Sequence, residues 1–195
     1  MTAANGWEVV RAEAARIVAR FDYQADRAFP FAHSLEIDAR LRADGLTVTT
    51  TLEPTERRRV PVSFGWHPYF RVPGPRRAWI LGLPACSQLE LDAKGIPSGK
   101  AWPRRAESLP LADRSFDDLF ALARTKRFTL AGRERTIVLR FGRGYDYAQI
   151  YAPPDKPFVA IEPMTAPTDA LVTGAAPLVR SGGAFSAVFD IGIAR

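Results

Sequence analysis

Two side chains, His67 and Glu162, have the chemistry to exchange protons with a substrate near neutral pH. His67 lies among the aromatic residues of segment 64–70, and the proline that follows it favours an extended conformation at the histidine. An imidazole titrates near neutrality, so it can act as an acid or as a base. Taken alone, this position fits a core histidine held by one hydrogen bond better than a catalytic histidine.

Glu162 directly follows the apolar residues 158–161 and precedes Pro163. Burying a carboxylate at the end of an apolar strand is unfavourable unless the group is paired or hydrogen-bonded. Partial burial would raise its pKa and make it a better base. A glutamate at a strand end that points into water fits the same pattern, and the spacing alone does not choose between the two interpretations.

Other side chains could bind the hydroxyl groups or the apolar face of a sugar. Asp117 and Asp118 lie between aromatic residues, although two adjacent acids are at least as common in a turn or at the start of a helix. Trp66 and Tyr69 could cover the C–H face of a pyranose ring, but an aromatic residue in a small β domain is more often part of the core. We expect His33 to be a half-exposed strand histidine.

The composition excludes several classes of protein. The net charge is +6, but the basic residues are scattered and accompany no nucleic-acid motif, so we expect no nucleic-acid partner. Cys86 is the only cysteine, which rules out an internal disulfide and a cysteine metal site. No apolar run approaches the roughly 20 residues of a membrane span. We expect no metal, no cofactor, no membrane association and no signal peptide, and therefore a cytoplasmic location.

The elements that must position these residues are predicted to be β-strands. Residues 35–41 and 46–52 alternate between apolar and polar side chains, and Asp44-Gly45 between them is typical of a hairpin turn. Residues 92–115, rich in glycine and proline, are expected to form a loop. The remaining predicted strands cover residues 15–22, 60–66, 79–83, 88–91, 127–130, 136–141, 147–151, 158–162 and 184–193. This pattern predicts an all-β antiparallel sandwich in a single domain over residues 1–195.

Two segments resemble the signatures of a known family. PVSFGWHPYFRVPG at residues 61–74 resembles the histidine-containing signature of the aldose 1-epimerases, or galactose mutarotases, and VAIEPMTAPTDAL at residues 159–171 resembles their glutamate-containing signature. FDDLF at residues 116–120 falls between them, where the family has a sugar-binding aspartate. The resemblance runs from about Trp7 to the end of the chain.

The resemblance implies a galactose mutarotase-like fold and the interconversion of α and β anomers of a free hexose without a cofactor. It also implies that His67 is the general acid, Glu162 the general base and Asp117 a ligand of sugar hydroxyls. The base removes the proton of the anomeric hydroxyl while the acid protonates the ring oxygen, and the ring opens to an aldehyde. Both groups must reach one sugar, so the fold must bring together two residues that are far apart in the sequence.

The chain departs from the family at its N-terminus. Family members carry earlier strands, a substrate-binding arginine and a second histidine in a His-Gly motif, none of which is matched here. We therefore expect an N-terminally shortened sandwich whose exposed sheet edges favour a homo-oligomer. The alternative to an isomerase is a carbohydrate-binding protein that has little or no catalytic activity.

Overall fold

The computed structural model describes residues 6–194 of the chain. No helix among these residues is both long and apolar enough to cross a membrane. The elements are strands, one 3-10 helix (η1) and one short α-helix, in the order β1 Glu8–Glu13, β2 Arg16–Tyr23, β3 His33–Arg42, β4 Gly45–Pro54, β5 Val60–Pro61, β6 Tyr69–Phe70, η1 Arg76–Ala78, β7 Ile80–Leu83, β8 Cys86–Leu91, β9 Pro97–Arg104, β10 Glu107–Pro110, β11 Phe116–Leu122, β12 Arg127–Ala131, β13 Thr136–Phe141, β14 Tyr147–Ala152, β15 Val159–Met164, α1 Ala170–Thr173, β16 Leu178–Val179 and β17 Phe185–Ala194.

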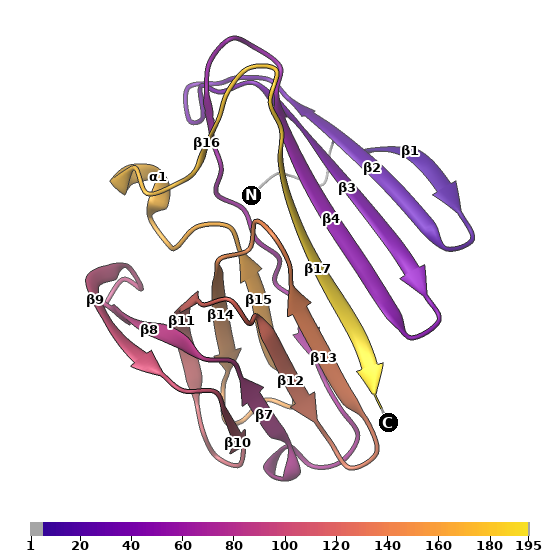
Figure 1. Cartoon of the computed structure of the whole chain (residues 1–195), viewed down its shortest axis with the longest axis vertical. Coiled ribbons are helices and arrows are strands. Elements are labelled where there is room, and N and C mark those ends of the chain that lie inside the picture. The colour runs from indigo at the N-terminus through magenta and orange to yellow at the C-terminus, as the bar shows by residue number, and fades with distance from the viewer. Residues whose placement is uncertain (1–5, 195) are drawn as a thin grey trace.

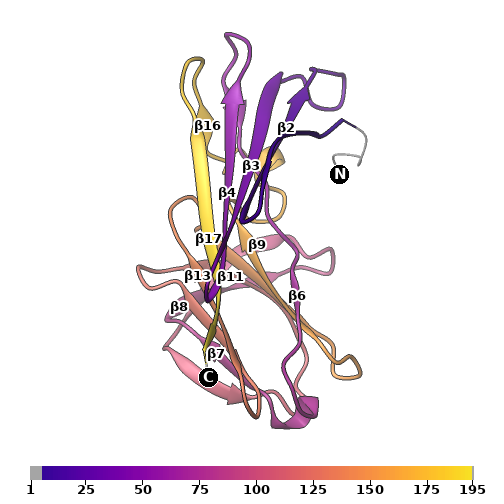
Figure 2. The same ribbon diagram turned by 90° about the vertical axis from the view of Figure 1, so that its right-hand side faces the viewer.

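The strands form two large sheets and a small one. The nine-stranded sheet has the order β1-β2-β3-β4-β17-β13-β12-β7-β10, the six-stranded sheet has the order β6-β15-β14-β11-β8-β9, and β16 pairs with β5. In Figure 1, β1 to β4 lie side by side at the upper right, whereas β8, β9 and β11 lie at the lower left. Figure 2 shows the long strands β3, β4 and β17 running together in the view from the side. The prediction of an antiparallel β-sandwich is confirmed.

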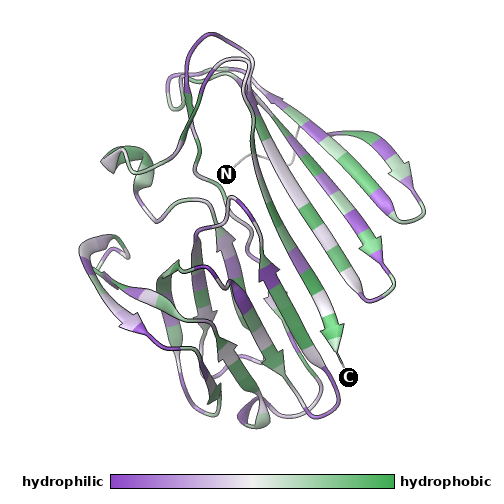
Figure 3. Ribbon diagram, viewed as in Figure 1, coloured by the Kyte–Doolittle hydropathy of each residue, from purple (hydrophilic) through white to green (hydrophobic). Residues whose placement is uncertain are grey.

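The hairpin of β3 and β4 follows from the alternation in the sequence. The two strands pair from His33 opposite Pro54 to Arg42 opposite Gly45, around the predicted turn. A Cβ atom on Gly45 would collide with the carbonyl oxygen of Ile191 in the adjacent β17, so glycine is required there. Hydrophobic and hydrophilic bands alternate along these strands in Figure 3, as expected when one face of a sheet is buried.

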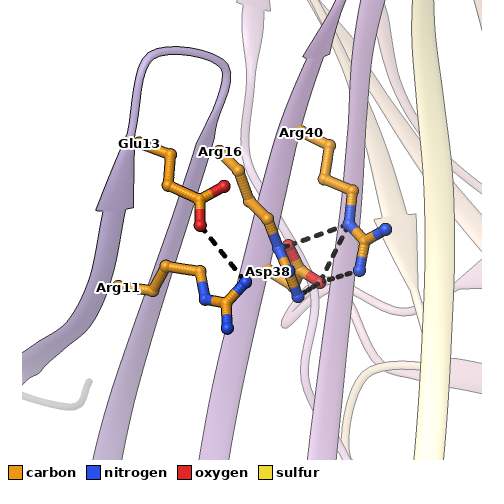
Figure 4. A network of polar contacts seen from close by, with 5 residues as sticks. All are labelled: Arg11, Glu13, Arg16, Asp38 and Arg40. Carbon is orange, nitrogen blue, oxygen red and sulfur yellow. Dashed lines mark hydrogen bonds and ion pairs between the residues drawn. The ribbon is translucent and has the colours of Figure 1, made fainter.

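Charged side chains pair on the first three strands (Figure 4). Arg16 donates hydrogen bonds from Nε and Nη2 to the two carboxylate oxygens of Asp38, at 3.0 and 2.9 Å, and Arg40 donates to the same group. These bonds, first from Arg40 and then from Arg16, lower the pKa of Asp38 to about 2. Arg11 pairs with Glu13 at 3.2 Å on β1. The bonds between Arg16 and Asp38 tie β2 to β3.

The main core lies between the two large sheets. Leu81 and Phe128 of the nine-stranded sheet and Phe120 and Ile150 of the six-stranded sheet are almost completely buried in one cluster. Only one face of the six-stranded sheet is used in this packing. The opposite face carries the partly exposed side chains of Gln149 and Glu162.

Two predicted segments differ from the structure. Residues 92–115 are not a loop, because they contain β9 and β10. Each of these strands lies at the edge of its sheet. Edge strands tolerate proline because one side of the backbone needs no ladder hydrogen bond, so Pro97, Pro103 and Pro110 do not prevent strand formation.

The expected strand over residues 60–66 is present only at Val60–Pro61. Beyond it residues 62–66 form no continuous strand ladder, only single hydrogen bonds and an isolated bridge. The Val62 N–H donates to the Pro177 carbonyl oxygen, and the Phe64 N–H donates to Thr165 Oγ1. The segment thus leads irregularly toward His67.

Candidate active site

The neighbouring strands β14 and β15 of the six-stranded sheet bring polar side chains together on its outer face, the face away from the main core. In β14, Ala148, Ile150 and Ala152 are buried, and the intervening residues point to the other side. Gln149 of β14 pairs with Glu162 of β15. The two-residue period of the strands therefore places both side chains on the outer face.

The segment before β6 brings His67 to the same face. Gly65 forms a bridge with Met164, and a Cβ atom on this glycine would lie only 2.8 Å from the Pro163 carbonyl oxygen. The adjacent Trp66 turns inward, where its Nε1–H donates to Thr50 Oγ1 at 3.1 Å. This close approach to β15 and the anchored indole hold the chain so that His67 emerges beside Glu162.

The imidazole and the carboxylate are in direct contact. His67 Nε2 lies 3.0 Å from Glu162 Oε1, and the His67 side chain is 51% exposed whereas that of Glu162 is 12% exposed. Glu162 Oε1 is buried and makes no hydrogen bond, so the imidazole is within ion-pair distance but not aligned as a donor. The imidazole is thus open to solvent, whereas the Oε1 atom of the carboxylate that it contacts is not.

The surroundings of Glu162 make it a base suited to neutral pH. Burial is the main cause and the negative charge of Asp117 the second, and together they raise the pKa of Glu162 to about 7. A general base is most effective when its pKa lies near the working pH.

The pKa of Glu162 predicts a dependence of stability on pH. Since the pKa rises from 4.5 to about 7, the folded protein binds more protons than the unfolded chain between these values, and stability falls as the pH rises through them. The substitution Glu162→Gln removes the titrating carboxyl group and, with it, this loss of stability. Allowing for solvent screening, we expect the variant to gain about 1–3 kcal/mol over the wild type between pH 4.5 and pH 8, measured by urea unfolding. The exposed Glu134→Gln should show no such gain, and an unchanged pH dependence in Glu162→Gln would contradict this assignment.

A pocket of about 390 Å³ opens beside Glu162. It is lined by residues of β8, β11, β14 and β15 and of the turns near them: Leu91, Asp92, Ala93, Gly95, Asp117, Gln149, Glu162, Met164 and Thr168. Gln149 Nε2 donates to Asp117 Oδ1 at 2.7 Å, which leaves the second oxygen of Asp117 and the amide oxygen of Gln149 available to a ligand. The pocket therefore combines hydrogen-bonding groups with one buried carboxylate.

The structure separates the two neighbouring aspartates. Both belong to strand β11, so this segment is neither a turn nor the start of a helix. Asp117 lines the pocket. Asp118 instead accepts a hydrogen bond from Gln88 Nε2 at 2.7 Å, and burial raises its pKa.

The aromatic candidates lie on different sides of the sheet. Trp66 packs against the core, with its ring centroid 6.0 Å from that of Phe189, so it does not line the pocket. Tyr69 lies on the outer face of the sheet, and its ring stacks on that of His67, with the ring centroids 4.6 Å apart. The structure thus gives Trp66 a supporting position and Tyr69 an exposed one.

Two findings go beyond or against the expectations from sequence. Gln149 was not anticipated, although the alternation of residues 147–152 places it on the face opposite Ala148 and Ile150. His33 is 6% exposed, not half exposed, because Tyr23 and Phe29 pack against its ring.

Within residues 6–194, no group of three or more His, Cys, Asp or Glu side chains is arranged to hold a metal ion.

Known proteins share both the sequence pattern and the fold. The sequence model of the family described as aldose 1-epimerase matches residues 4–178. Slr1438 from Synechocystis sp. PCC 6803 is 24% identical, with a TM-score of 0.80 over 96% of this chain and 65% of that protein. A galactose mutarotase-like protein from Clostridium acetobutylicum is 19% identical, with a TM-score of 0.83 over 97% of this chain and 66% of that protein.

A galactose mutarotase related enzyme from Lactobacillus acidophilus is 15% identical, with a TM-score of 0.85 over 97% of this chain and 71% of that protein. No curated protein sequence matches the chain significantly. The chain spans about two thirds of the length of these solved relatives, 65% and 66% for the first two. The match to the family model covers most of the chain, and the chain therefore belongs to the aldose 1-epimerase family.

Proposed function

We propose that this protein interconverts the α and β anomers of a free hexose, with Glu162 as the general base and His67 as the general acid. The observation that carries this proposal is the 3.0 Å separation of His67 Nε2 and Glu162 Oε1 at the edge of the pocket. The anomeric oxygen O1 and the ring oxygen O5 are both bonded to C1. An acid and a base that act on these two oxygens must therefore be close neighbours, as His67 and Glu162 are.

The reaction is a reversible pair of proton transfers. The Glu162 carboxylate takes the proton from O1–H while the protonated His67 imidazole gives a proton to O5, and the C1–O5 bond breaks to leave an aldehyde and a hydroxyl on C5. Rotation about C1–C2 turns the other face of the aldehyde toward the hydroxyl. Ring closure then returns the O1 proton from Glu162 and the O5 proton to His67, and both groups regain their initial states.

The pocket next to the pair favours an uncharged sugar. Among the nine described residues that line it, three are carboxylates, Asp92, Asp117 and Glu162, and none is a lysine or an arginine. A sugar phosphate would bring negative charge to these carboxylates, which is unfavourable. We therefore assign the free sugar as substrate, with Asp117 and Gln149 binding its hydroxyls.

Polarimetry on freshly dissolved α-glucose and α-galactose tests this function. We expect the wild-type protein to accelerate the approach to anomeric equilibrium in proportion to its concentration, with a weaker effect on glucose 6-phosphate. Relaxation at the rate of buffer alone, for both free sugars, would refute the proposal.

A second candidate is a carbohydrate-binding protein with little catalysis. It is favoured by one observation: the chain spans only about two thirds of the length of its solved relatives, 65% and 66% for the first two. Small errors in orientation reduce rates strongly. Calorimetric binding of glucose or galactose without accelerated relaxation would support this candidate, and the absence of binding would remove it.

A further inference from the structure

Four strands lie at the edges of the two large sheets, and three of them have features that discourage pairing with another chain. Among residues 6–194, the nine-stranded sheet ends in β1 and β10, and the six-stranded sheet ends in β6 and β9. Strand β6 has only two residues, and β10 ends in Pro110. Strand β9 contains Pro97, Lys100 and Pro103. Short length, proline and lysine all keep an edge strand from accepting a further strand.

Strand β1 has none of these features. Its six residues, EVVRAE, include no proline and no lysine, and all six are exposed. Two apolar side chains lie in the middle of the strand, Val9 at 61% exposed and Val10 at 49% exposed. In Figure 1, β1 lies at the outer edge of the sheet, with β2 on one side and no labelled strand on the other. The backbone edge of β1 is therefore open to a partner strand.

Two opposite charges flank the valines of β1. Glu8 precedes Val9, and Arg11 follows Val10. The pairing with β2 places Glu8 and Arg11 on the same face of the sheet, because the β2 residues opposite them are two positions apart. The central part of the strand thus has an acid at one end, a base at the other and apolar side chains between them.

A second copy of β1 complements this arrangement when it runs antiparallel to the first. With Val9 of each copy opposite Val10 of the other, Glu8 of each copy lies opposite Arg11 of the other. A two-fold axis then passes between the valines, as in an isologous interface. Opposite charges across two strands are favourable. A shift of two residues would instead place Glu8 opposite Glu13, which is unfavourable.

Contacts within the chain leave this edge of β1 without strong partners. The register of β1 and β2 shifts between Val9 and Arg11, so Val10 is an extra residue with no partner on β2. Arg11 pairs with Glu13 at 3.2 Å, but the two side chains are 50% and 57% exposed (Figure 4). Such exposed pairs contribute little to stability, so Arg11 loses little when it turns to a second copy.

We propose that this protein forms a two-fold symmetric homodimer in which the β1 strands of two copies pair antiparallel, with Val9 opposite Val10 and Glu8 opposite Arg11. The paired strands join the nine-stranded sheets of the two copies into one continuous sheet. The inference does not depend on the proposed function, because β1 contributes no residue to the pocket or to the pair of His67 and Glu162.

Sedimentation equilibrium of the full chain at a series of concentrations tests the inference. We expect the wild type to show a monomer–dimer equilibrium. Arg11→Glu and Glu8→Arg each place like charges opposite one another twice in the dimer, and each should raise the dissociation constant by roughly 5- to 100-fold. The variant with both substitutions restores opposite charges, and its dissociation constant should return toward that of the wild type.

The valines are tested in the same way. Val9→Lys puts a charge in the middle of the edge strand and should weaken the dimer strongly. The matched control is Val172→Lys in α1, where the valine is 82% exposed, and its dissociation constant should equal that of the wild type. Urea unfolding shows whether each variant is folded before it is compared.

Three results would overturn the inference: a wild type that stays monomeric at the highest concentration reached, a dimer that Val9→Lys leaves intact, or a double charge variant that dimerises no better than the single ones. The double variant distinguishes contact between copies from damage within the chain. It keeps Arg at position 8 opposite Arg20 and Glu at position 11 near Glu13, so its recovery can come only from the pairing of two copies.

Discussion

Glu162→Gln is expected to lower kcat for anomer exchange by about 10²- to 10⁴-fold, the usual contribution of a positioned base. The amide keeps the size of the side chain but cannot take the proton from O1–H. The loss should fall on kcat more than on KM, because the substitution removes proton transfer in the transition state and leaves Asp117 and Gln149 to bind hydroxyls.

The matched control for this substitution is Glu134→Gln, which makes the same change at an exposed position between β12 and β13. Its kcat should equal that of the wild type. The two variants are compared by polarimetry at pH 7.5, after urea unfolding has shown that both are folded. Retention of half or more of the wild-type kcat by Glu162→Gln would exclude Glu162 as the base.

His67→Ala is the second substitution with a large expected effect, again about 10²- to 10⁴-fold on kcat. It removes the group that protonates O5, and it removes the ring that stacks on Tyr69. Since the His67 side chain is 51% exposed, imidazole added to the solution can reach the vacated position. We expect imidazole to restore part of the activity of His67→Ala, measured against the background that imidazole gives with Glu162→Gln.

The double variant separates catalysis from independent structural damage. When two residues act together in one step, removing both reduces the rate little more than removing either alone. We therefore expect His67→Ala combined with Glu162→Gln to be about as inactive as Glu162→Gln. Multiplicative losses, or a His67→Ala variant that imidazole does not restore, would show that His67 acts only through packing.

Local patterns in the sequence were sufficient for much of the fold. The β3 and β4 hairpin could be predicted because its alternation has one interpretation and Asp44-Gly45 specifies the turn. Strands β9 and β10 could not, because their prolines indicate loops unless the strands are known to lie at sheet edges. Edge position is a property of the assembled sheets, and no local pattern encodes it.

In the site, too, local sequence identified the residues, but only the folded chain brings them together. The resemblance to a family pointed to His67, Glu162 and Asp117, but periodicity alone could not bring His67 to Glu162. Their contact depends on the bridge between Gly65 and Met164, which joins distant parts of the chain. Burial of Glu162, and hence its pKa of about 7, likewise follows from strand pairing and not from its neighbours in the sequence.

Trp66 and Gln149 illustrate how register decides the role of a residue. Trp66 lies next to His67 in the sequence, yet its side chain points into the core and bonds to Thr50. Gln149 carries no motif, yet its pairing with Glu162 places it in the pocket. Proximity in the sequence was therefore a poor guide to which side chains share a face, and strand alternation was a better one.

In the proposed mechanism, one bound sugar contacts both His67 and Glu162. NMR titration of protein labelled with ¹³C in glutamate carboxyl groups and ¹⁵N in histidine rings, with galactose or glucose added, measures this directly. We predict that the Glu162 carboxyl and the His67 imidazole signals shift together and give one dissociation constant, while the His33 ring in its separate aromatic cluster does not shift. A titration in which only one of the two signals moves, or neither, would contradict the account.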